Sequence, residues 1–460
     1  MLTLRGLLNT VGIQPESLDH IKIIGKDPIL PTPFRIGETG AIILAAIGYS
    51  IEELWYAQTG RRQTVEIGVK EAAIAQRSHQ YLRIVNEKTP ELWDPISGFY
   101  RTKDNRWIQL HCNFPHHRQG VIETLQCADE KAAVEKTILE NWEALNLETV
   151  LSEKGLCASM VRTTQEWQAS EQARSIARLP PIEIIKIGES LPEALPISDR
   201  PLAALRVLDL TRVIAGPICA RTLAEQGANV LNISSPHLPS IAPLVMDTGH
   251  GKYSAYLDLN QSKDCESLKK LAKSADVFLQ AYRPGALADK GFSKETLSKM
   301  RPGIIYVELS AYSHVGPWAG RHGYDSLVQS ATGIAHEQGI ANGTPDTPQH
   351  LPAQSLDYIA GYLASLGVLV ALQRRMREGG SYYIRTSLAQ IAHWIISLER
   401  VSNYERCKIP LREDIPEMLT LSKTEFGLLE HLKPVLKFSE TTATWKKTTT
   451  PLGTDQPKWE

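Results

Sequence analysis

Several features that mark specialised classes of protein are missing from this sequence. Its 460 residues carry 50 basic and 51 acidic side chains, so there is no basic excess to bind nucleic acid or an anionic membrane surface. The longest apolar stretches, such as residues 41–49 and 361–372, are too short to cross a bilayer. The first five residues, MLTLR, lack the charged segment and apolar core of a secretory leader. We therefore expect a cytoplasmic protein with neither a nucleic-acid nor a membrane partner.

Cysteine is scarce. Six cysteines lie at positions 112, 127, 157, 219, 265 and 407, and no two form a CxxC pair, which is typical of reduced thiols in a cytosolic protein. The one cluster of metal-binding residue types is His111-Cys112 with His116-His117. Cys112 and His116 would share a face only on a helix, and Phe114-Pro115 predicts a loop here. We therefore expect no metal site.

The common nucleotide and hydrolase motifs are also missing. The sequence has no GxGxxG after its first α/β strand, no GxxxxGK[ST] and no GxSxG. The turn after Leu210 contains Pro217, which lacks an amide hydrogen that would otherwise face a pyrophosphate. This argues against NAD as a cofactor.

What is present is an alternation of strand and helix patterns. Residues 206–210 and 229–233 are short apolar runs of strand type, and residues 218–225 between them are helical, which predicts a βαβ unit and a parallel sheet. Two more apolar runs follow at 275–280 and 303–309. We expect an α/β fold with a Rossmann-like doubly wound parallel sheet and a smaller α+β domain. Ligand chemistry is then expected at the carboxyl ends of the strands.

A short internal repeat links the two ends of the chain. Residues 44–48 match residues 363–367, and each match is followed twelve residues later by a glycine, Gly60 or Gly379. A β-like run comes next in both copies. The constant offset places Glu38 opposite Asp357. Duplication is the favoured interpretation, and a chance match of two helices rich in alanine and glycine is the alternative.

Four segments resemble, in the right order, the signatures of one enzyme family. They are residues 206–217 with 223–228, residues 282–287, residues 316–318 with 323–329, and Asp357, ten residues before Gly367. This order is similar to that of the class III CoA-transferases, the CaiB/BaiF family, whose catalytic aspartate falls at the position of Asp357. Residues 59–63 and 155–161 resemble the later half and the small domain of the same family. The chain therefore reads as a later half followed by an earlier half.

The resemblance implies four parts of the chain. Residues 1–93 are a partial repeat of the core, 94–200 a small α+β domain and linker, 201–400 the CoA-binding domain, and 401–460 a tail packing on the core. It also implies a homodimer that takes acyl-CoA and a free carboxylic acid as substrates, with no covalently bound cofactor. The implied CoA contacts are Ile214, Ala215, Leu257, Asp258, Leu259, Asn260, Ala281, Tyr282, Arg283, His322, Gly323, Tyr324 and Asp325. Among basic residues, Arg283 and Lys252 are the expected phosphate partners.

The chemistry of Asp357 agrees with a catalytic role. A carboxylate attacks a thioester readily because the thiolate leaves well, and the product is a mixed anhydride that CoA can convert to an aspartyl-CoA thioester. The N-terminus of a helix would stabilise the carboxylate. From its position alone an N-cap would be the simpler interpretation, but the ordered signatures favour the nucleophile.

Three alternatives remain open at this point. A racemase of the family would pair the aspartate with a histidine, which would fall at Tyr324; His322 is two residues earlier and is expected to point elsewhere. Tyrosine is a poor proton shuttle near neutral pH, so CoA transfer is favoured over a racemase or lyase. A catalytically weak CoA-binding protein is the third possibility. Glu38 is a relic nucleophile, a residue that assists Asp357, or an acid that only stabilises its own helix.

Overall fold

The centre of the protein is a seven-stranded sheet. The computed structural model describes residues 3–283 and 285–460, so Met1, Leu2 and Pro284, the last within the second signature, lie outside the described residues. The strand order is β10-β9-β8-β11-β12-β13-β7, and only β7 runs antiparallel to its neighbour. The strands are β7 (Glu183–Gly188), β8 (Arg206–Asp209), β9 (Asn229–Ser234), β10 (Lys252–Tyr256), β11 (Val277–Gln280), β12 (Ile305–Ser310) and β13 (Ser381–Ser387).

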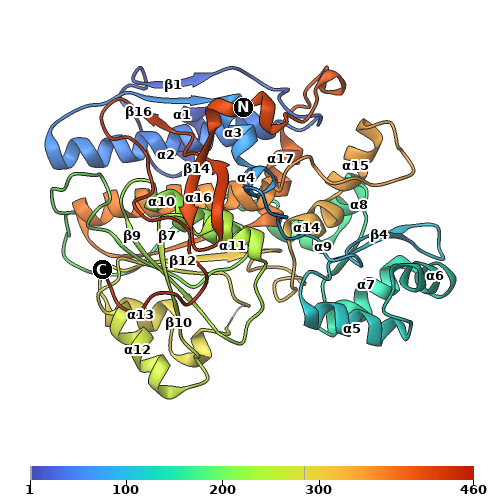
Figure 1. Ribbon diagram of the computed structural model, residues 1–460. Helices are drawn as coiled ribbons and strands as arrows, with labels where there is room; N and C mark the ends of the chain where they lie inside the picture. The colour runs from blue at the N-terminus through green and yellow to red at the C-terminus, as the bar shows by residue number, and fades with distance from the viewer. Residues whose placement is uncertain (1–2, 284) are drawn as a thin grey trace.

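Helices cover both faces of this sheet, as Figure 1 shows. Alternate residues of each strand point to opposite faces, so Val207 packs with α10 (Ala215–Ala224) and α16 (Ser355–Glu378). Its neighbour Leu208 packs in the second core with α12 (Ser262–Ala272) and α13 (Lys294–Met300). The predicted α/β doubly wound fold is therefore confirmed. The carboxyl ends of the parallel strands meet at one edge of the sheet.

The structure repeats one pattern of elements at the offset seen in the sequence. Helix α2 (Ile36–Thr59) and helix α16 each contain 24 residues, and they pack against each other. The offset that relates Ile36 to Ser355 also relates the last residue of β2 (Val65–Gly68) to the last residue of β13. It likewise relates the first residues of α3 (Val69–Ala75) and α17 (Leu388–Ser397). Element bounds thus follow the repeat that the sequence predicts.

A smaller α+β lobe lies beside the main sheet (Figure 1). Its sheet contains β4 (Gly98–Arg101), β5 (Trp107–Leu110) and β6 (Ala158–Met160), and the hairpin turn contains Asn105 at a φ of 60°. Its helices are α5 (Pro115–Leu125), α6 (Lys131–Asn141) and α7 (Ala144–Glu153). The prediction of a loop at Phe114-Pro115 was wrong, because Pro115 starts a helix at a position where its missing amide hydrogen costs nothing.

The last sixty residues are built into the fold. β16 (Lys437–Phe438) pairs with β2, which pairs with β1 (Ile21–Ile24) on its other side. In a second small sheet, β15 (Gly427–Leu432) lies between β14 (Leu419–Thr424) and β3 (Arg83–Ile84). The chain then returns to the main sheet, where the amide of Asp455 donates to the carbonyl of Ser254 at 2.7 Å. The remaining helices are α1 (Leu4–Thr10), α4 (Ser78–Tyr81), α8 (Thr164–Ala169), α9 (Glu171–Ile176), α11 (Ala242–Thr248), α14 (Asp325–Thr332) and α15 (Ile334–Ala341). The division into four domains stays a prediction.

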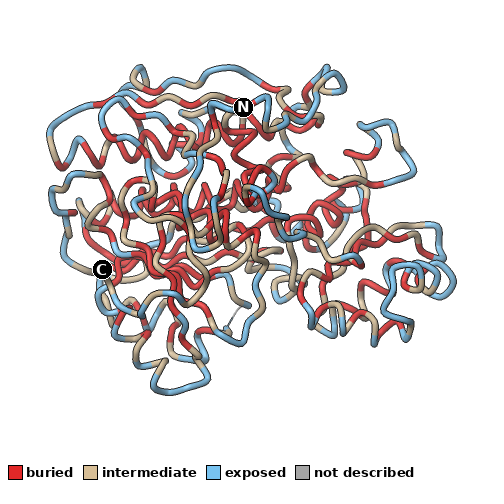
Figure 2. The backbone as a smooth tube through the Cα atoms, in the orientation of Figure 1, coloured by how far each residue is buried: buried red, intermediate tan, exposed pale blue. Residues whose placement is uncertain are grey.

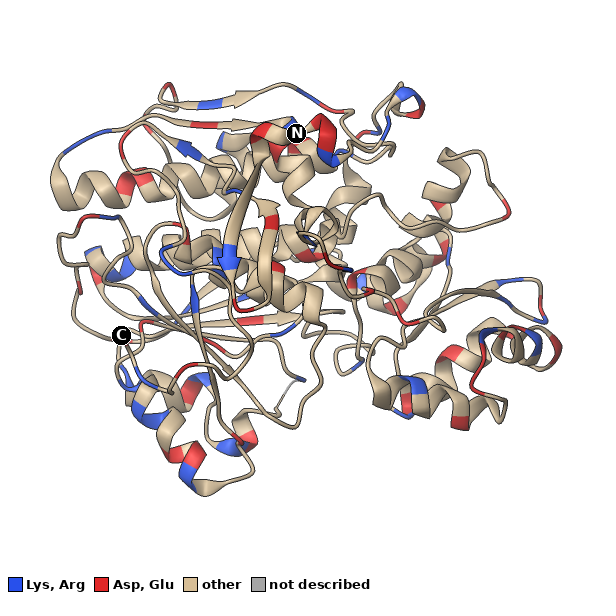
Figure 3. Cartoon of the chain, in the orientation of Figure 1, with Lys and Arg blue, Asp and Glu red and all other residues tan. Residues whose placement is uncertain are grey.

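Burial follows this layering. Figure 2 shows the buried backbone concentrated along α2, α16 and the main sheet. Helix α16 is long and apolar enough to cross a membrane, but its most apolar window is wholly buried inside the fold, as expected of a core helix. Charged residues of both signs are interspersed over the outer helices, including α12 (Figure 3).

Candidate active site

A cavity of about 380 Å³ opens where β8, β11 and β12 end. Its walls come from the loops that follow these strands, from the loop before α14, and from the first turn of α16. This is the edge at which ligands bind in doubly wound sheets. The predicted residues that line it are Ile214, Ala215, Ala281, Tyr282, Arg283, His322, Gly323, Tyr324 and Asp357.

Five predicted contact residues do not line this cavity. Leu257, Asp258, Leu259 and Asn260 follow β10, which is the edge strand and is separated from β8 by β9. Asp325 lies behind Asp357 and lines a smaller cavity of about 30 Å³ next to the small lobe. The expected contact at residues 257–260 therefore remains a prediction for a longer ligand.

The two basic residues expected to bind phosphate differ in their availability. Arg283 is exposed and lines the cavity. Lys252 is buried, and its ammonium group pairs with Asp209 at 2.9 Å and donates to the carbonyl of Pro217 at 2.9 Å. Its charge is therefore already paired inside the sheet, and its role as a phosphate partner stays a prediction.

Asp357 is the third residue of α16. The N-cap is Gln354, so the alternative in which Asp357 only caps its helix is wrong. Its side chain is 7% exposed and lines both the large cavity and the smaller one, with the small lobe on one side and the strand ends on the other. Its backbone amide donates to Oδ2 of Asp325 at 2.9 Å. The carboxyl group thus lies in the wall between the two cavities.

Asp325 and Asp357 form a buried carboxyl pair. Burial first, and then the charge of Asp325, hold the pKa of Asp357 well above its usual range. Burial also raises the pKa of Asp325 to about 7, although hydrogen bonds from the amide of Asp357 and from Gln329 act in the opposite direction. Two carboxylates so close in a dry site do not both ionise readily. Burial and the neighbouring charge therefore disfavour the state in which both groups are ionised.

The turn after β8 is strained. Val213 has a φ of 73°, in the left-handed region that a β-branched side chain rarely adopts. It lines both the cavity of about 380 Å³ and the smaller cavity next to the small lobe. It also lines a third cavity, of about 60 Å³, which extends past Ser234 and Ser235. Backbone strain of this kind is concentrated at functional sites. The turn joins the space beside Asp357 to the end of β9.

Histidines from two parts of the chain share the cavity with Asp357. His116 and His117 come from α5, and His322 comes from the loop before α14. His322 was expected to point elsewhere, and it lines the same cavity as Asp357. Cys157, which no sequence motif marks as a site residue, lies beside His117 and His322. Spacing along the chain held no signal for this cluster, since its members come from three separate segments.

Glu38 occupies a related but different place. Its amide donates to Oδ2 of Asp27 at 2.8 Å, as the amide of Asp357 does to Asp325. Its carboxylate, however, pairs with Arg35 at 2.5 Å and is 22% exposed. Glu38 does not line the cavity of Asp357. The geometry therefore favours the interpretation of Glu38 as a first-turn acid that stabilises its own helix.

The chain is similar to known CoA-transferases. Residues 202–412 match the family model described as CoA-transferase family III. An acetyl-coenzyme A transferase of Hypoxylon pulicicidum is 30% identical over 369 residues, which cover 75% of this chain and 61% of that protein. An acyl-CoA transferase of Gibberella moniliformis is 27% identical, with 81% and 72% covered. The succinyl-CoA–L-malate CoA-transferase β subunit of Chloroflexus aurantiacus is 33% identical, with 41% and 49% covered.

The match to solved structures is partial. A CaiB/BaiF family protein from Brucella suis is 26% identical, with 50% of this chain and 65% of that chain covered and a TM-score of 0.40. The chain spans 61% of the first curated relative named above and about half of the Chloroflexus protein. The family assignment rests on the sequence matches. Through residues 202–412, the chain belongs to CoA-transferase family III, the CaiB/BaiF family.

Proposed function

We propose that the protein transfers CoA from an acyl-CoA thioester to a free carboxylic acid, with Asp357 as the nucleophile. The observation that carries this proposal is the place of Asp357: a buried carboxyl group in the wall of a cavity at the strand ends, on a chain of this family. Homodimer assembly and cytoplasmic location stay predictions from the family resemblance.

The transfer divides into four balanced steps. A carboxylate oxygen of Asp357 attacks the acyl carbonyl carbon, the C–S bond breaks, and CoA leaves as thiolate. The thiolate then attacks the aspartyl carbonyl, which releases the donor acid and forms an aspartyl-CoA thioester. The incoming carboxylate displaces CoA from this thioester, and the thiolate attacks the new acyl group. The carboxylate of Asp357 is restored and no proton is consumed.

The low polarity of the site has two opposite effects on these steps. Burial raises the pKa of Asp357 and so disfavours the ionised form, which must be present for attack. It also excludes water, which would hydrolyse the anhydride and the thioester. Arg283, exposed beside the cavity, can pair with a phosphate of CoA. Tyr324, from the loop before α14, lines the same cavity.

Trapping tests the covalent intermediate directly. When the protein is incubated with an acyl-CoA and no acceptor acid, we expect hydroxylamine to leave a hydroxamate, or borohydride an alcohol, on the peptide that contains Asp357. Peptide mass spectrometry identifies the modified residue. An adduct on another residue, or CoA turnover without any adduct, would contradict the proposal. Asp357→Asn serves as the control, because an amide forms no such thioester.

The carboxyl pair sets an expected pH dependence. Since the protonated carboxyl group is not nucleophilic, kcat/KM should fall as the pH drops through the raised pKa of the pair, far above the range of an ordinary aspartate. Asp325→Asn removes the neighbouring charge, so we expect the acid limb of the profile to move to lower pH. The measurement is kcat/KM against pH for both proteins. An acid limb that stays in place in Asp325→Asn would show that the two groups are not coupled.

One observation favours a second candidate, an acyl-CoA racemase. His116, His117 and His322 share the cavity with Asp357, so an acid and a base could lie on either side of a substrate α-carbon. A racemase would exchange the α-proton of a 2-methylacyl-CoA with deuterium oxide without any acceptor acid. A transferase would not, and CoA transfer without this exchange would eliminate the racemase.

A further inference from the structure

Two histidines and one cysteine converge at the wall of the cavity. His117 lies on α5, Cys157 precedes β6, and His322 lies in the loop before α14. One donor atom from each of the three lies within 4.8 Å of the other two. Nε2 of His117 is 3.7 Å from Sγ of Cys157. The cluster therefore combines two residues of the small lobe with one from the loop between β12 of the main sheet and α14.

These distances fit a tetrahedral metal ion. With a zinc–sulfur bond of about 2.3 Å and a zinc–nitrogen bond of about 2.0 Å, tetrahedral ligands lie about 3.5 Å apart. The first two ligands already have this separation. The third lies within 4.8 Å of both, and His322 can adjust its position because it is only half-buried and lies in a loop. Two imidazoles and a thiolate are ligands that zinc prefers.

Ordinary packing leaves His117 poorly satisfied. The side chain is 3% exposed, its Nδ1 has no hydrogen-bond partner within the described residues, and its Nε2 meets only the weak sulfur acceptor of Cys157. A weak partner for a buried ring nitrogen is costly, and coordination of a metal by Nε2 would replace the contact with sulfur by a stronger bond. Cys157 itself is fully buried and faces the same point.

We propose that His117, Cys157 and His322 bind a zinc ion whose fourth coordination position faces the cavity. Both histidines line the cavity, so the open position lies on the substrate side, as in zinc sites that act on a ligand. A zinc ion with one thiolate ligand keeps a net positive charge, which suits a carboxylate or thioester oxygen. The ion would orient the acyl substrate toward Asp357. This site is separate from covalent catalysis by Asp357.

Metal content tests the site without reference to activity. The full chain, purified without chelator, should contain about one zinc ion per chain, as measured by inductively coupled plasma mass spectrometry. Cobalt taken up in place of zinc should show a thiolate-to-cobalt charge-transfer band. Cys157→Ser should abolish this band and most of the bound metal. His322→Ala should weaken metal binding without threatening the fold, since the residue lies in a loop.

Cys112→Ser is the matched control, because Cys112 is also a buried cysteine of the small lobe but is outside the cluster. It should keep both the metal and the cobalt band. A wild-type chain that holds neither zinc nor cobalt would overturn the proposal, and so would a cobalt band that survives Cys157→Ser. If Cys157→Ser fails to fold, the metal content of His322→Ala decides. Trapping at Asp357 is read separately, so the two proposals can fail independently.

Discussion

Asp357→Asn is expected to lower kcat/KM for CoA transfer by on the order of 10⁴-fold, because an amide oxygen cannot form the anhydride and the remaining groups only bind the substrates. The measurement is steady-state exchange between an acyl-CoA and a labelled acid. Glu38→Gln is the matched control, since Glu38 is the third residue of the equivalent helix and its amide also meets an aspartate. It should keep the rate within about threefold.

The same variant has an expected effect on stability, which distinguishes catalysis from folding. The pKa of Asp357 is raised in the folded protein, so wild-type stability falls as the pH rises through that pKa, while the asparagine variant has no such dependence. The melting temperature of the wild type relative to Asp357→Asn should therefore fall as the pH rises from the ordinary range of an aspartate to that raised pKa, and then level off. Full activity in the variant, or a loss of activity that follows unfolding, would refute the catalytic role.

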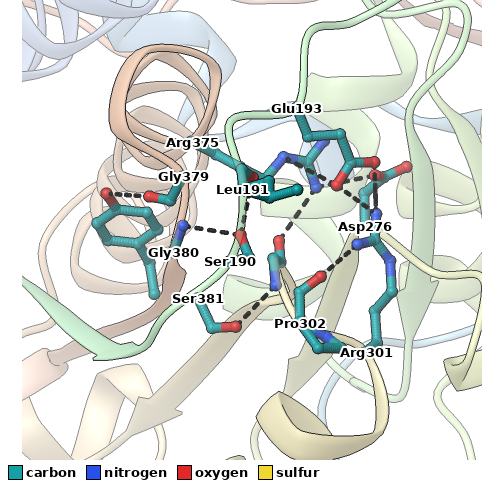
Figure 4. A network of polar contacts seen from close by, with 12 residues as sticks. Ser190, Leu191, Glu193, Asp276, Arg301, Pro302, Arg375, Gly379, Gly380 and Ser381 are labelled. Atoms are coloured by element: carbon teal, nitrogen blue, oxygen red, sulfur yellow. Dashed lines mark hydrogen bonds and ion pairs between the residues drawn. The ribbon is translucent and has the colours of Figure 1, made fainter.

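Arg375→Ala is expected to destabilise the fold by about 3 kcal/mol, because it removes the nearer of the two cations that pair with the carboxylate of Asp276 and leaves only Arg301, at 3.3 Å. Arg375 is 1% exposed, and its guanidinium pairs with Asp276 at 2.9 Å and donates to the carbonyl of Gly303 at 3.1 Å. Figure 4 shows how this network joins the end of α16 to the residues before β11 and β12. Arg301 completes it by pairing with Glu193 at 2.6 Å.

The measurement is denaturant unfolding followed by circular dichroism. Arg377→Ala is the control, since Arg377 is exposed on the last turn of the same helix and should change stability by less than about 0.5 kcal/mol. Equal effects of the two substitutions would show that the buried network does not hold the sheet to α16. The network lies at the amino ends of the strands, away from the cavity, so CoA binding by the folded fraction should be unchanged.

Most of the main sheet was predictable because its strands are buried on both faces and are therefore continuously apolar. This holds for β8, β9, β11 and β12. β10 was missed because it begins with Lys252, which is buried only through its pair with Asp209 on β8. No pattern of apolar residues reveals a partner 43 positions away in the chain. β7 was also missed. It is an edge strand that pairs antiparallel with β13, so it lacks the continuous apolar run of a strand that is buried on both faces.

The sequence by itself determined the family, the α/β fold class and the place of Asp357 after the ordered signatures. Each of these depends on local patterns, which are apolar runs, turn residues and short motifs. Only the tertiary structure placed Asp325 beside Asp357 and raised the pKa of both, since burial depends on what packs around a residue. It also showed that Asp357 is not the N-cap of its helix and that Lys252 pairs with Asp209. It brought Cys157 together with His117 and His322. Each of these relations joins residues whose separation along the chain says nothing about their distance in space.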